Sequence, residues 1–222
     1  MHVTYSDQDL ERYDLEMDRR VVVTGMGAVT PLGCTVDTFW EGLKNGKCGI
    51  DLIQKFDTTD FKVKVGAEVK DFDPELYMSK KDVKRNDPYA VYALAAAVQA
   101  FDDSGLDMEK EDAAKVGVIV GSGIGGLMTM QEQVIRLHEK GPSRVSPLFI
   151  PMTISNMAAG NIAIRLGAKG VCENIVTACA TGTNCIGTAF RDIKHGYLDA
   201  CIAGGAEAVP YTHLTLPTNS LV

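Results

Sequence analysis

The sequence lacks the long apolar run that a membrane-spanning helix needs, because no uninterrupted stretch approaches about 18 apolar residues. No signal-like apolar segment opens the chain, and no two cysteines have the C-x-x-C spacing of a zinc or redox motif. Positive charge is not in excess, since 22 Lys and Arg stand against 29 Asp and Glu and give a net charge of −7. We therefore expect no membrane protein, no metal-built fold and no broad binding to nucleic acid.

The composition is that of a well-packed globular chain. With 45% hydrophobic and 23% charged residues among 222, the chain can bury a core as one large or two small domains. We expect its six cysteines to be reduced thiols of a cytoplasmic protein: Cys34, Cys48, Cys172, Cys179, Cys185 and Cys201.

The chain divides into a short polar leader and an α/β region. Residues 1–16 are polar without clear periodicity, whereas Met17 leads directly into a basic pair and an apolar run, which makes Met17 a plausible start. Beyond it, β-branched runs alternate with helix-like segments, which favours an α/β architecture with largely parallel strands. The expected strands are Arg20–Thr24, Val63–Val69, Lys115–Val120, Asn174–Thr177 and Asp199–Ala203.

Three expected helices have recognisable ends. Thr35 can cap a helix that stops at Gly46, and Pro88 opens an alanine-rich helix that ends near Gly105. The second of these is apolar all round, which implies burial on several sides. A third runs from about residue 179 to residue 195, and its spacing predicts one packed face made of Ile186, Ala189, Phe190 and Ile193.

Cys179 lies between an expected strand and the third helix, in a turn made of small residues. Unpaired N–H groups at a helix N-terminus, with the positive end of the helix dipole, favour a thiolate over a thiol. The same groups can hold an oxyanion that develops on a thioester carbonyl. Cys179 is therefore a candidate nucleophile. The alternative, from the residues alone, is a small buried hydrophobe, which is what free cysteines usually are.

Several motifs, in one order along the chain, carry a resemblance to a known family. They are Val21-Val-Val-Thr-Gly-Met-Gly-Ala-Val-Thr-Pro-Leu-Gly33, Gly121-Ser-Gly-Ile-Gly-Gly126, Ser146-Pro-Leu-Phe-Ile-Pro151, Ile154-Ser-Asn-Met157, Thr177-Ala-Cys-Ala-Thr-Gly182 and Ala203-Gly-Gly-Ala-Glu207. The chain resembles the β-ketoacyl-acyl-carrier-protein synthases over about residues 18 to 209. The resemblance implies an α/β thiolase-like fold, with residues 17–210 as the first of two αβαβα halves of a five-layered protein.

The same resemblance implies an acyltransferase of fatty acid biosynthesis. Cys179 would accept the acyl group from acyl carrier protein, and decarboxylation of malonyl-acyl-carrier protein would give the carbanion that condenses with it. No organic cofactor and no metal are expected. Two alternatives stay open: a thiolase-like or polyketide condensing enzyme, and a non-catalytic subunit of chain-length-factor type, against which the retained cysteine argues.

The glycine-rich segment Gly121–Gly126 follows an expected strand and precedes a helix, so it also satisfies the dinucleotide-binding pattern. That pattern needs an acidic residue at the end of a second strand about 20 residues later, but Glu139 closes a helical stretch instead. We therefore predict a tight turn rather than a cofactor site. By resemblance, Ile124 lines or gates an acyl pocket, and Phe149 reaches the pocket of the neighbouring subunit in a homodimer.

Lys81, Lys84 and Arg85 lie on nearly one face of a short expected helix in an otherwise acidic chain. Such a run is usually a solvated surface. By resemblance, however, these residues, and more weakly Arg144, would contact acyl carrier protein, whose strong negative charge complements them.

The resemblance also predicts that this chain alone is inactive. Elongating members use a Cys-His-His site whose histidines come from later His-Gly-Thr and Gly-His motifs, and neither motif is matched by His2, His138, His195 or His213. An oxyanion donor is expected from a later glycine-rich loop as well. The resemblance stops after Pro210, and we expect residues 211–222 to be a foreign tail.

Overall fold

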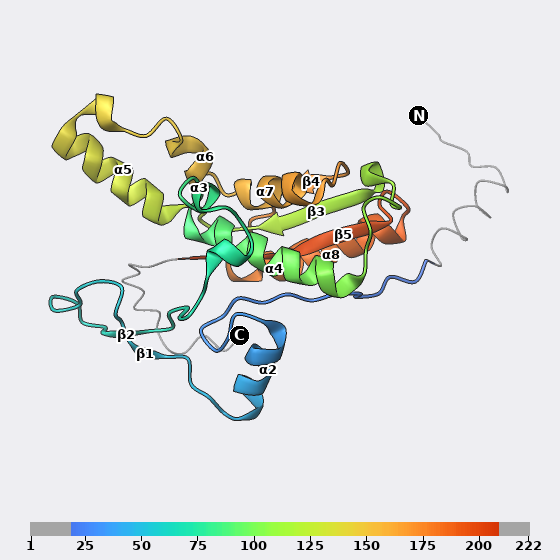
Figure 1. Cartoon of the computed structure of the whole chain (residues 1–222), viewed down its shortest axis with the longest axis horizontal. Helices are drawn as coiled ribbons and strands as arrows, with labels where there is room; N and C mark the ends of the chain where they lie inside the picture. Colours follow the sequence, from blue (N-terminus) through green and yellow to red (C-terminus); the bar gives the residue numbers. More distant parts are fainter. Residues whose placement is uncertain (1–18, 209–222) are drawn as a thin grey trace, which may run out of the picture.

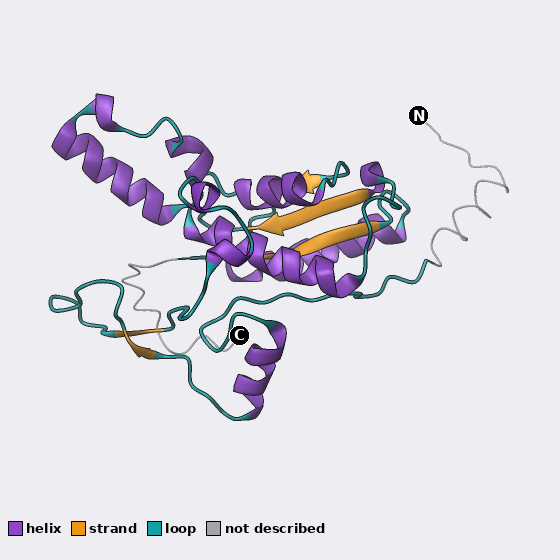
Figure 2. Ribbon diagram, viewed as in Figure 1, coloured by secondary structure: helices purple, strands orange, loops and turns teal. Residues whose placement is uncertain are grey.

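The computed structural model describes residues 19–208, so the expected leader and tail lie outside the described residues. Its centre is a parallel three-stranded sheet in the order β4-β3-β5, made of Cys172–Glu173, Val116–Gly121 and Ala200–Gly205. Helices cover both faces of this sheet (Figures 1 and 2). A separate antiparallel pair joins β1 (Asp51–Leu52) to β2 (Val65–Gly66).

The helices and turns are distributed around this sheet, with α5 and α6 projecting from one end (Figure 1). The α-helices are α2 (Val36–Lys44), α3 (Lys80–Val83), α4 (Pro88–Ser104), α5 (Leu127–Lys140), α6 (Phe149–Thr153), α7 (Met157–Leu166) and α8 (Thr181–Lys194). Short 3-10 turns are η1 (Pro74–Leu76), η2 (Ala113–Lys115), η3 (Pro142–Arg144) and η4 (Ala178–Ala180).

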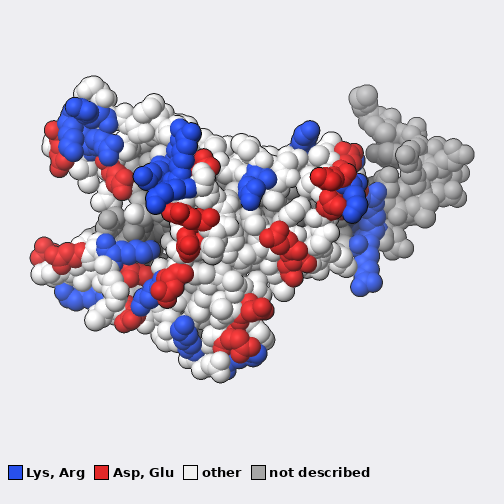
Figure 3. Space-filling view, viewed as in Figure 1, with Lys and Arg blue, Asp and Glu red and all other residues white. Residues whose placement is uncertain are grey.

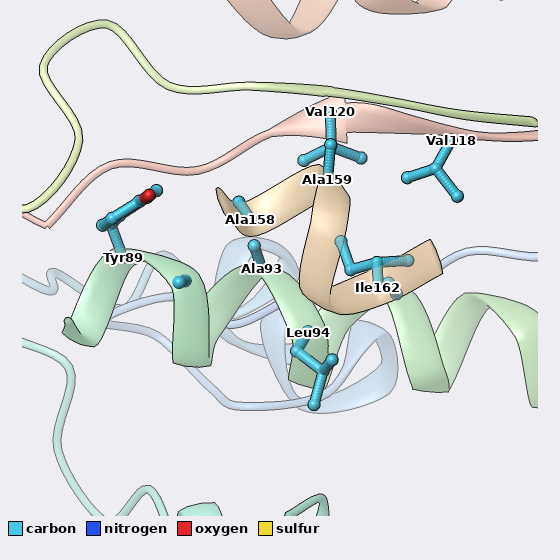
Figure 4. Close-up of a cluster of buried hydrophobic side chains, with 10 residues drawn as sticks. Tyr89, Ala93, Leu94, Val118, Val120, Ala158, Ala159 and Ile162 are labelled. Atoms are coloured by element: carbon cyan, nitrogen blue, oxygen red, sulfur yellow. The ribbon is translucent and has the colours of Figure 1, made fainter. Parts of the chain in front are cut away.

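β3 is the buried centre of the sheet, and its side chains alternate between two helical layers. Val118 and Val120 belong to a cluster with α4 and α7 (Figure 4). Ile119 packs instead with Cys185 and Ala189 of α8. Because successive side chains of a strand point to opposite faces, α4 and α7 cover one face of the sheet and α8 covers the other. The expected α/β architecture with parallel strands is confirmed.

The ends of α4 follow from its sequence. Asp87 caps the helix through the N–H of Tyr89, Pro88 occupies its first turn, and Gly105 ends it in the left-handed conformation. The fully buried Asp87 also accepts hydrogen bonds from the backbone N–H and the hydroxyl of Thr129, at 3.0 and 2.8 Å. One carboxylate therefore joins the start of α4 to the first turn of α5.

Other expected elements are confirmed with small shifts of their ends. The strands expected at Lys115–Val120 and Asp199–Ala203 are β3 and β5. The helix capped by Thr35 is α2, in which Thr35 and Thr38 form a reciprocal capping box.

The strand expected at Arg20–Thr24 is wrong, since these residues are irregular in the structure. The chain that follows is tied to side chains of α4: Met26 N–H donates to Asp103 and Ala28 N–H donates to Gln99. A strand forms only where a neighbouring strand supplies its hydrogen bonds, and within residues 19–208 none pairs with this segment.

Two further strand predictions are wrong in position. Val63–Val69 contributes only the two residues of β2, and the strand expected at Asn174–Thr177 lies just before it, as β4. Asn174 stands just outside the ladder, and its side chain accepts a hydrogen bond from the N–H of Ser122 at 2.9 Å.

α8 is confirmed as a helix, but its packed face is only partly the predicted one: Ala189 is buried and Ile193 is half-buried, whereas the other two predicted residues are not. The buried stripe consists of Thr181, Cys185 and Ala189, whereas Ile186 and Phe190 are 55% and 46% exposed. Small side chains take the buried side because α8 lies directly against β5, where large ones would not fit.

Within the described part of the chain, no helix combines the length and the apolar character needed to cross a bilayer.

Candidate functional site

Cys179 lies in η4, the short turn that leads directly into α8. α8 begins at Thr181, slightly later than expected, and Cys179 is exposed rather than part of a buried helix. Ala180 is the N-cap and has no side chain that could accept a hydrogen bond. Its methyl group therefore caps none of the N–H groups of the first turn of α8, which lie beside the cysteine.

Polar contacts hold the cysteine turn from both sides. Thr177 N–H donates to Thr181 Oγ1 at 2.9 Å, and Asn184 Nδ2 donates to Thr177 Oγ1 at 2.8 Å. Between them, Ala178 has a φ of 51°, a left-handed conformation that residues other than glycine rarely adopt. A strained residue directly before Cys179 thus fixes the direction of the chain at the sulfur-bearing residue.

The segment Gly121–Gly126, called the glycine loop below, lies beside this turn. A Cβ atom at Gly123 would lie 3.8 Å from Ala178 Cα and 2.9 Å from Glu207 Oε2. The Glu207 carboxylate holds the loop by accepting hydrogen bonds from Ser122 Oγ at 3.0 Å, Gly123 N–H at 2.8 Å and Ile124 N–H at 3.2 Å. Glu207 follows β5, so this contact joins two of the sequence motifs.

The backbone N–H groups of residues 122–126 all donate within the protein. Besides the bonds to Glu207, Ser122 donates to Asn174 Oδ1, Gly125 to Ser122 Oγ and Gly126 to Thr153 O. In a dinucleotide-binding loop the corresponding N–H groups face a phosphate. Here a carboxylate of the same chain takes the place of that anion, which accounts for the glycine pattern without a phosphate ligand.

The two predicted pocket residues lie on segments that contact each other, Ile124 in the glycine loop and Phe149 in α6. Ile124 stands in the loop and is 51% exposed. Phe149 opens α6 and is half-buried, and the other end of α6 accepts the Gly126 hydrogen bond through Thr153. The loop that carries Ile124 thus contacts α6 and also lies next to the cysteine turn, through Gly123. The acyl-pocket roles of Ile124 and Phe149 stay predictions.

The predicted basic residues are exposed. Lys81 lies in α3, Lys84 caps its end and Arg85 follows. Figure 3 shows a basic area over α3, with acidic side chains directly next to it. Arg144 lies in η3, at the outer end of α5 and apart from α3 (Figure 1). The structure thus brings three of the four residues together and separates Arg144 from them.

The other cysteines differ from Cys179 in environment. Burial raises the pKa of Cys201 to about 12 and raises the pKa of Cys185 as well. Burial, and then the charge of Glu173, raise the pKa of Cys172 although its surface is exposed. A raised pKa lowers the small fraction of each of these three thiols that is present as the nucleophilic thiolate.

Neither histidine of the described chain can serve Cys179. His195 caps the far end of α8, whose 14 residues span about 21 Å at 1.5 Å per residue. His138 lies near the end of α5, which projects away from the sheet (Figure 1). Among residues 19–208, no three His, Cys, Asp or Glu side chains are grouped as ligands for a metal ion.

Sequence reasoning missed the polar residues that position the site. Glu207, Asn174 and Asp87 each bind backbone N–H groups of a segment distant in sequence. A signal existed for Glu207, because it ends the motif that begins at Ala203, but its partner loop could not be read from spacing. Asp87 and Asn174 gave no signal beyond ordinary helix capping and turn propensity.

A family sequence model described as "Beta-ketoacyl synthase, N-terminal domain" matches residues 18–215. Relatives called 3-oxoacyl-(acyl-carrier-protein) synthase 2 are 51% identical in Vibrio cholerae and 48% in Synechocystis, over 85% and 86% of this chain. The Staphylococcus aureus relative is 46% identical over 91% of this chain. These matches cover 46%, 46% and 49% of the relatives, so the chain spans about half their length.

Solved structures agree on the fold. The ishigamide ketosynthase/chain length factor superposes with a TM-score of 0.78 at 29% identity, over 86% of this chain and 48% of that one. A type II polyketide ketosynthase, solved in complex with its acyl-carrier protein, superposes with a TM-score of 0.71 at 24% identity, over 84% and 50%. The expected thiolase-like α/β fold of the ketosynthases is confirmed.

Proposed function

Because this chain belongs to the β-ketoacyl synthase family, as an N-terminal domain of it, we propose that the protein it represents elongates acyl chains in fatty acid biosynthesis. The reaction would be the decarboxylative condensation of an acyl group with malonyl-acyl-carrier protein, and Cys179 would be the nucleophile. The single observation that supports this most is the position of Cys179: exposed, after a strained residue, and directly before the N-terminus of α8.

The proposed chemistry has two halves. First, the Cys179 thiolate attacks the carbonyl carbon of an acyl thioester, and the carbon–sulfur bond to the carrier breaks, so the carrier leaves as a thiolate and takes a proton from water. Second, malonyl thioester loses carbon dioxide, and the resulting carbanion forms a carbon–carbon bond with the acyl group. The bond to Cys179 breaks in this step and the thiolate is regenerated. N–H groups at the start of α8 are suited to the oxyanion of either step.

We assign the carrier-protein contact to Lys81, Lys84 and Arg85. Their exposure and their clustering at α3 support docking of an acidic partner. The polyketide ketosynthase of similar fold is described as bound to its acyl-carrier protein. Arg144 would contribute less, because it lies apart from the other three.

We also propose a homodimer in the cytoplasm. α5, α6 and the turn after α6 expose a run of large apolar side chains, which are Val134, Ile135, Leu137, Ile150 and Ile154. A second copy of the chain would cover such a face, and Phe149 would then approach the neighbouring subunit. The six cysteines, all free, are compatible with a reducing compartment.

The test of the nucleophile is site-specific acylation. The 222-residue chain is incubated briefly with an acyl thioester or an epoxide inhibitor of condensing enzymes, and modified peptides are mapped by mass spectrometry. We expect the adduct on Cys179 and its loss in Cys179→Ala. Cys48→Ala is the matched control, because Cys48 is also exposed, and it should keep the adduct. An adduct chiefly on Cys172 or Cys185 would contradict the assignment.

A second candidate function is a polyketide condensing enzyme. The ishigamide ketosynthase/chain length factor of similar fold keeps this candidate open. The 46–51% identity over most of the chain to relatives called 3-oxoacyl-(acyl-carrier-protein) synthase 2 favours elongation instead. A non-catalytic partner of chain-length-factor type is disfavoured by the retained and exposed Cys179.

A further inference from the structure

Glu207 is the acidic side chain that the glycine loop binds, and its position is fixed by the sheet. β5 pairs with β3 along its whole length, and Ala206 N–H extends this pairing to Gly121 O at 3.0 Å. The next residue is Glu207, so its backbone has little freedom to move away from the loop. Its two carboxylate oxygens then share three donors from three successive loop residues.

We propose that Glu207 is a positioning residue that holds the glycine loop against the cysteine turn and so fixes the place of Ile124 beside Cys179. The proposal rests on the assignment of Cys179 as the nucleophile and on the acyl-pocket role predicted for Ile124. It adds that selection among acyl groups of different length depends on a carboxylate that itself touches neither the acyl chain nor the sulfur.

The close packing around Gly123 supports a positioning role. A Cβ atom there would lie only 2.9 Å from Glu207 Oε2, so the carboxylate reaches the loop because residue 123 has no side chain. The same position is 3.8 Å from Ala178 Cα, in the turn that carries Cys179. The carboxylate thus contacts the loop, and the loop contacts the cysteine turn. Movement of the loop therefore changes which loop residues lie next to the turn.

Asn174 is a second anchor, and it holds the start of the glycine loop, where the loop leaves β3. Ser122 N–H donates to Asn174 Oδ1 at 2.9 Å, and Asn174 Nδ2 donates to Ser155 Oγ at 2.9 Å. Because this anchor does not involve Glu207, removal of the carboxylate should loosen residues 123 and 124 while the base of the loop stays in place. That difference separates a positioning role from general loss of folding.

The experiment compares the 222-residue chain with its Glu207→Ala and Glu207→Gln variants. Amide hydrogen exchange reports on the loop. The relative rates at which iodoacetamide and N-dodecyl iodoacetamide alkylate Cys179 report on the approach of short and long groups. Glu111→Ala, an exposed glutamate at a distance from the loop, is the matched control.

In Glu207→Ala we expect exchange at residues 123 and 124 to rise on the order of tenfold, because both N–H groups lose the carboxylate oxygen Oε2 to which they donate. We expect the rate for the dodecyl reagent, relative to iodoacetamide, to rise about fivefold as Ile124 becomes free to move. Glu207→Gln keeps one acceptor oxygen and should restore most of both changes. Glu111→Ala should change neither.

Unchanged exchange in Glu207→Ala would overturn the proposal, and so would faster exchange with an unchanged ratio of the two rates. If Glu207→Ala does not fold, Glu207→Asp shortens the side chain that carries the carboxylate and should shift the ratio in the same direction by less. No shift there would also overturn it. If Cys179 takes no acyl group from thioesters in the unchanged chain, the proposed function fails, whereas the exchange result still decides the role of Glu207.

Discussion

At the scale of single residues, the molecule uses buried polar groups to join segments that are far apart in sequence. Asp87 joins α4 to α5, and Tyr89 donates its hydroxyl to Ile154 O at 2.5 Å, at the turn between α6 and α7. Burial, and next the charge of Asp87, raise the pKa of Tyr89 to about 12. The core cluster in Figure 4 is thus closed at one end by a phenol that must keep its proton.

This phenol makes stability depend on alkaline pH. The unfolded chain releases the tyrosine proton near pH 10, whereas the folded chain holds it to about 12. The contribution of Tyr89 is therefore fully present below pH 10 and is lost as the pH rises through 12. We expect urea denaturation to show a shallower fall in stability over this range for Tyr89→Phe. That variant should also lose about 1 kcal/mol at neutral pH from the missing hydrogen bond.

Tyr197→Phe is the control, because Tyr197 is 68% exposed and should leave the pH slope unchanged. The half-buried Cys201, whose pKa is also raised to about 12, adds to the slope in the same direction, so the Tyr89→Phe variant should flatten it without abolishing it. An identical slope in Tyr89→Phe and the unchanged chain would contradict this role.

At the scale of elements, glycines allow the cysteine turn to sit against the sheet. A Cβ atom at Gly121 would lie 2.3 Å from both Ile175 O and Thr181 Cγ2, whereas one at Gly187, within α8, would meet nothing within 4 Å. We expect Gly121→Ala to cost about 1–3 kcal/mol because β3 and the start of α8 must separate. Gly187→Ala should stabilise by about 0.5–1 kcal/mol, since alanine favours a helix. Urea titrations measure both, and equal effects would refute the packing argument.

α3 and the residues that follow it carry the basic cluster, which we test for a role in docking acyl carrier protein. We expect joint replacement of Lys81, Lys84 and Arg85 by glutamate in a completed enzyme to lower kcat/KM for acyl-carrier-protein substrates at least about tenfold, by loss of electrostatic steering. Small thioester analogues should be affected little, because α3 lies outside the cysteine turn. The control is Lys110→Glu, an exposed lysine elsewhere. An equal loss for both substrate types would exclude a docking role.

The elements that could be predicted from sequence are those with local signals at their ends, such as α4, and those that are buried along their whole length, such as β3. Capping residues gave both ends of α4, and the apolar run gave β3. The strand at Arg20–Thr24 failed because strand formation depends on a partner elsewhere in the chain. The packed face of α8 was predicted correctly at Ala189 but wrongly at Ile186 and Phe190, because periodicity identifies apolar residues but not the spacing between helix and sheet.

For the site, sequence located Cys179 and the glycine loop, since both have distinctive small-residue patterns. It could not reveal that Glu207 binds the loop, because a contact between residues 84 apart has no local signature. The dinucleotide pattern was a correct description of the loop's glycines. The pattern does not reveal that the anion bound by these N–H groups is the carboxylate of Glu207 rather than a phosphate.

At the scale of the whole molecule, the chain offers one part of the proposed catalytic machinery. It spans about half the length of its relatives, and the two described histidines lie away from Cys179. Large apolar side chains are also exposed on several elements, among them Val23 at 78% and Ile164 at 80%. A partner domain would remove these surfaces from water.

We therefore expect the 222-residue chain to accept an acyl group but not to condense it. Absence of general acid–base help costs about 10² to 10⁴ in rate, and absence of an oxyanion donor about 10² to 10³ more. Release of carbon dioxide from malonyl-acyl-carrier protein should be undetectable, while a version completed with the second half should release it. Decarboxylation by this chain at a rate near that of the completed protein would refute the half-site argument.

The left-handed Ala178 has a consequence for how this domain can be improved by mutation. Glycine adopts that conformation without steric strain, so we expect Ala178→Gly to raise the melting temperature in thermal denaturation, by more than the greater freedom of glycine in the unfolded chain lowers it. The same change gives the turn more conformations and makes the direction of Cys179 less defined. Selection for heat resistance and selection for turnover would therefore favour different residues at position 178, a trade-off located within one peptide unit of the sulfur.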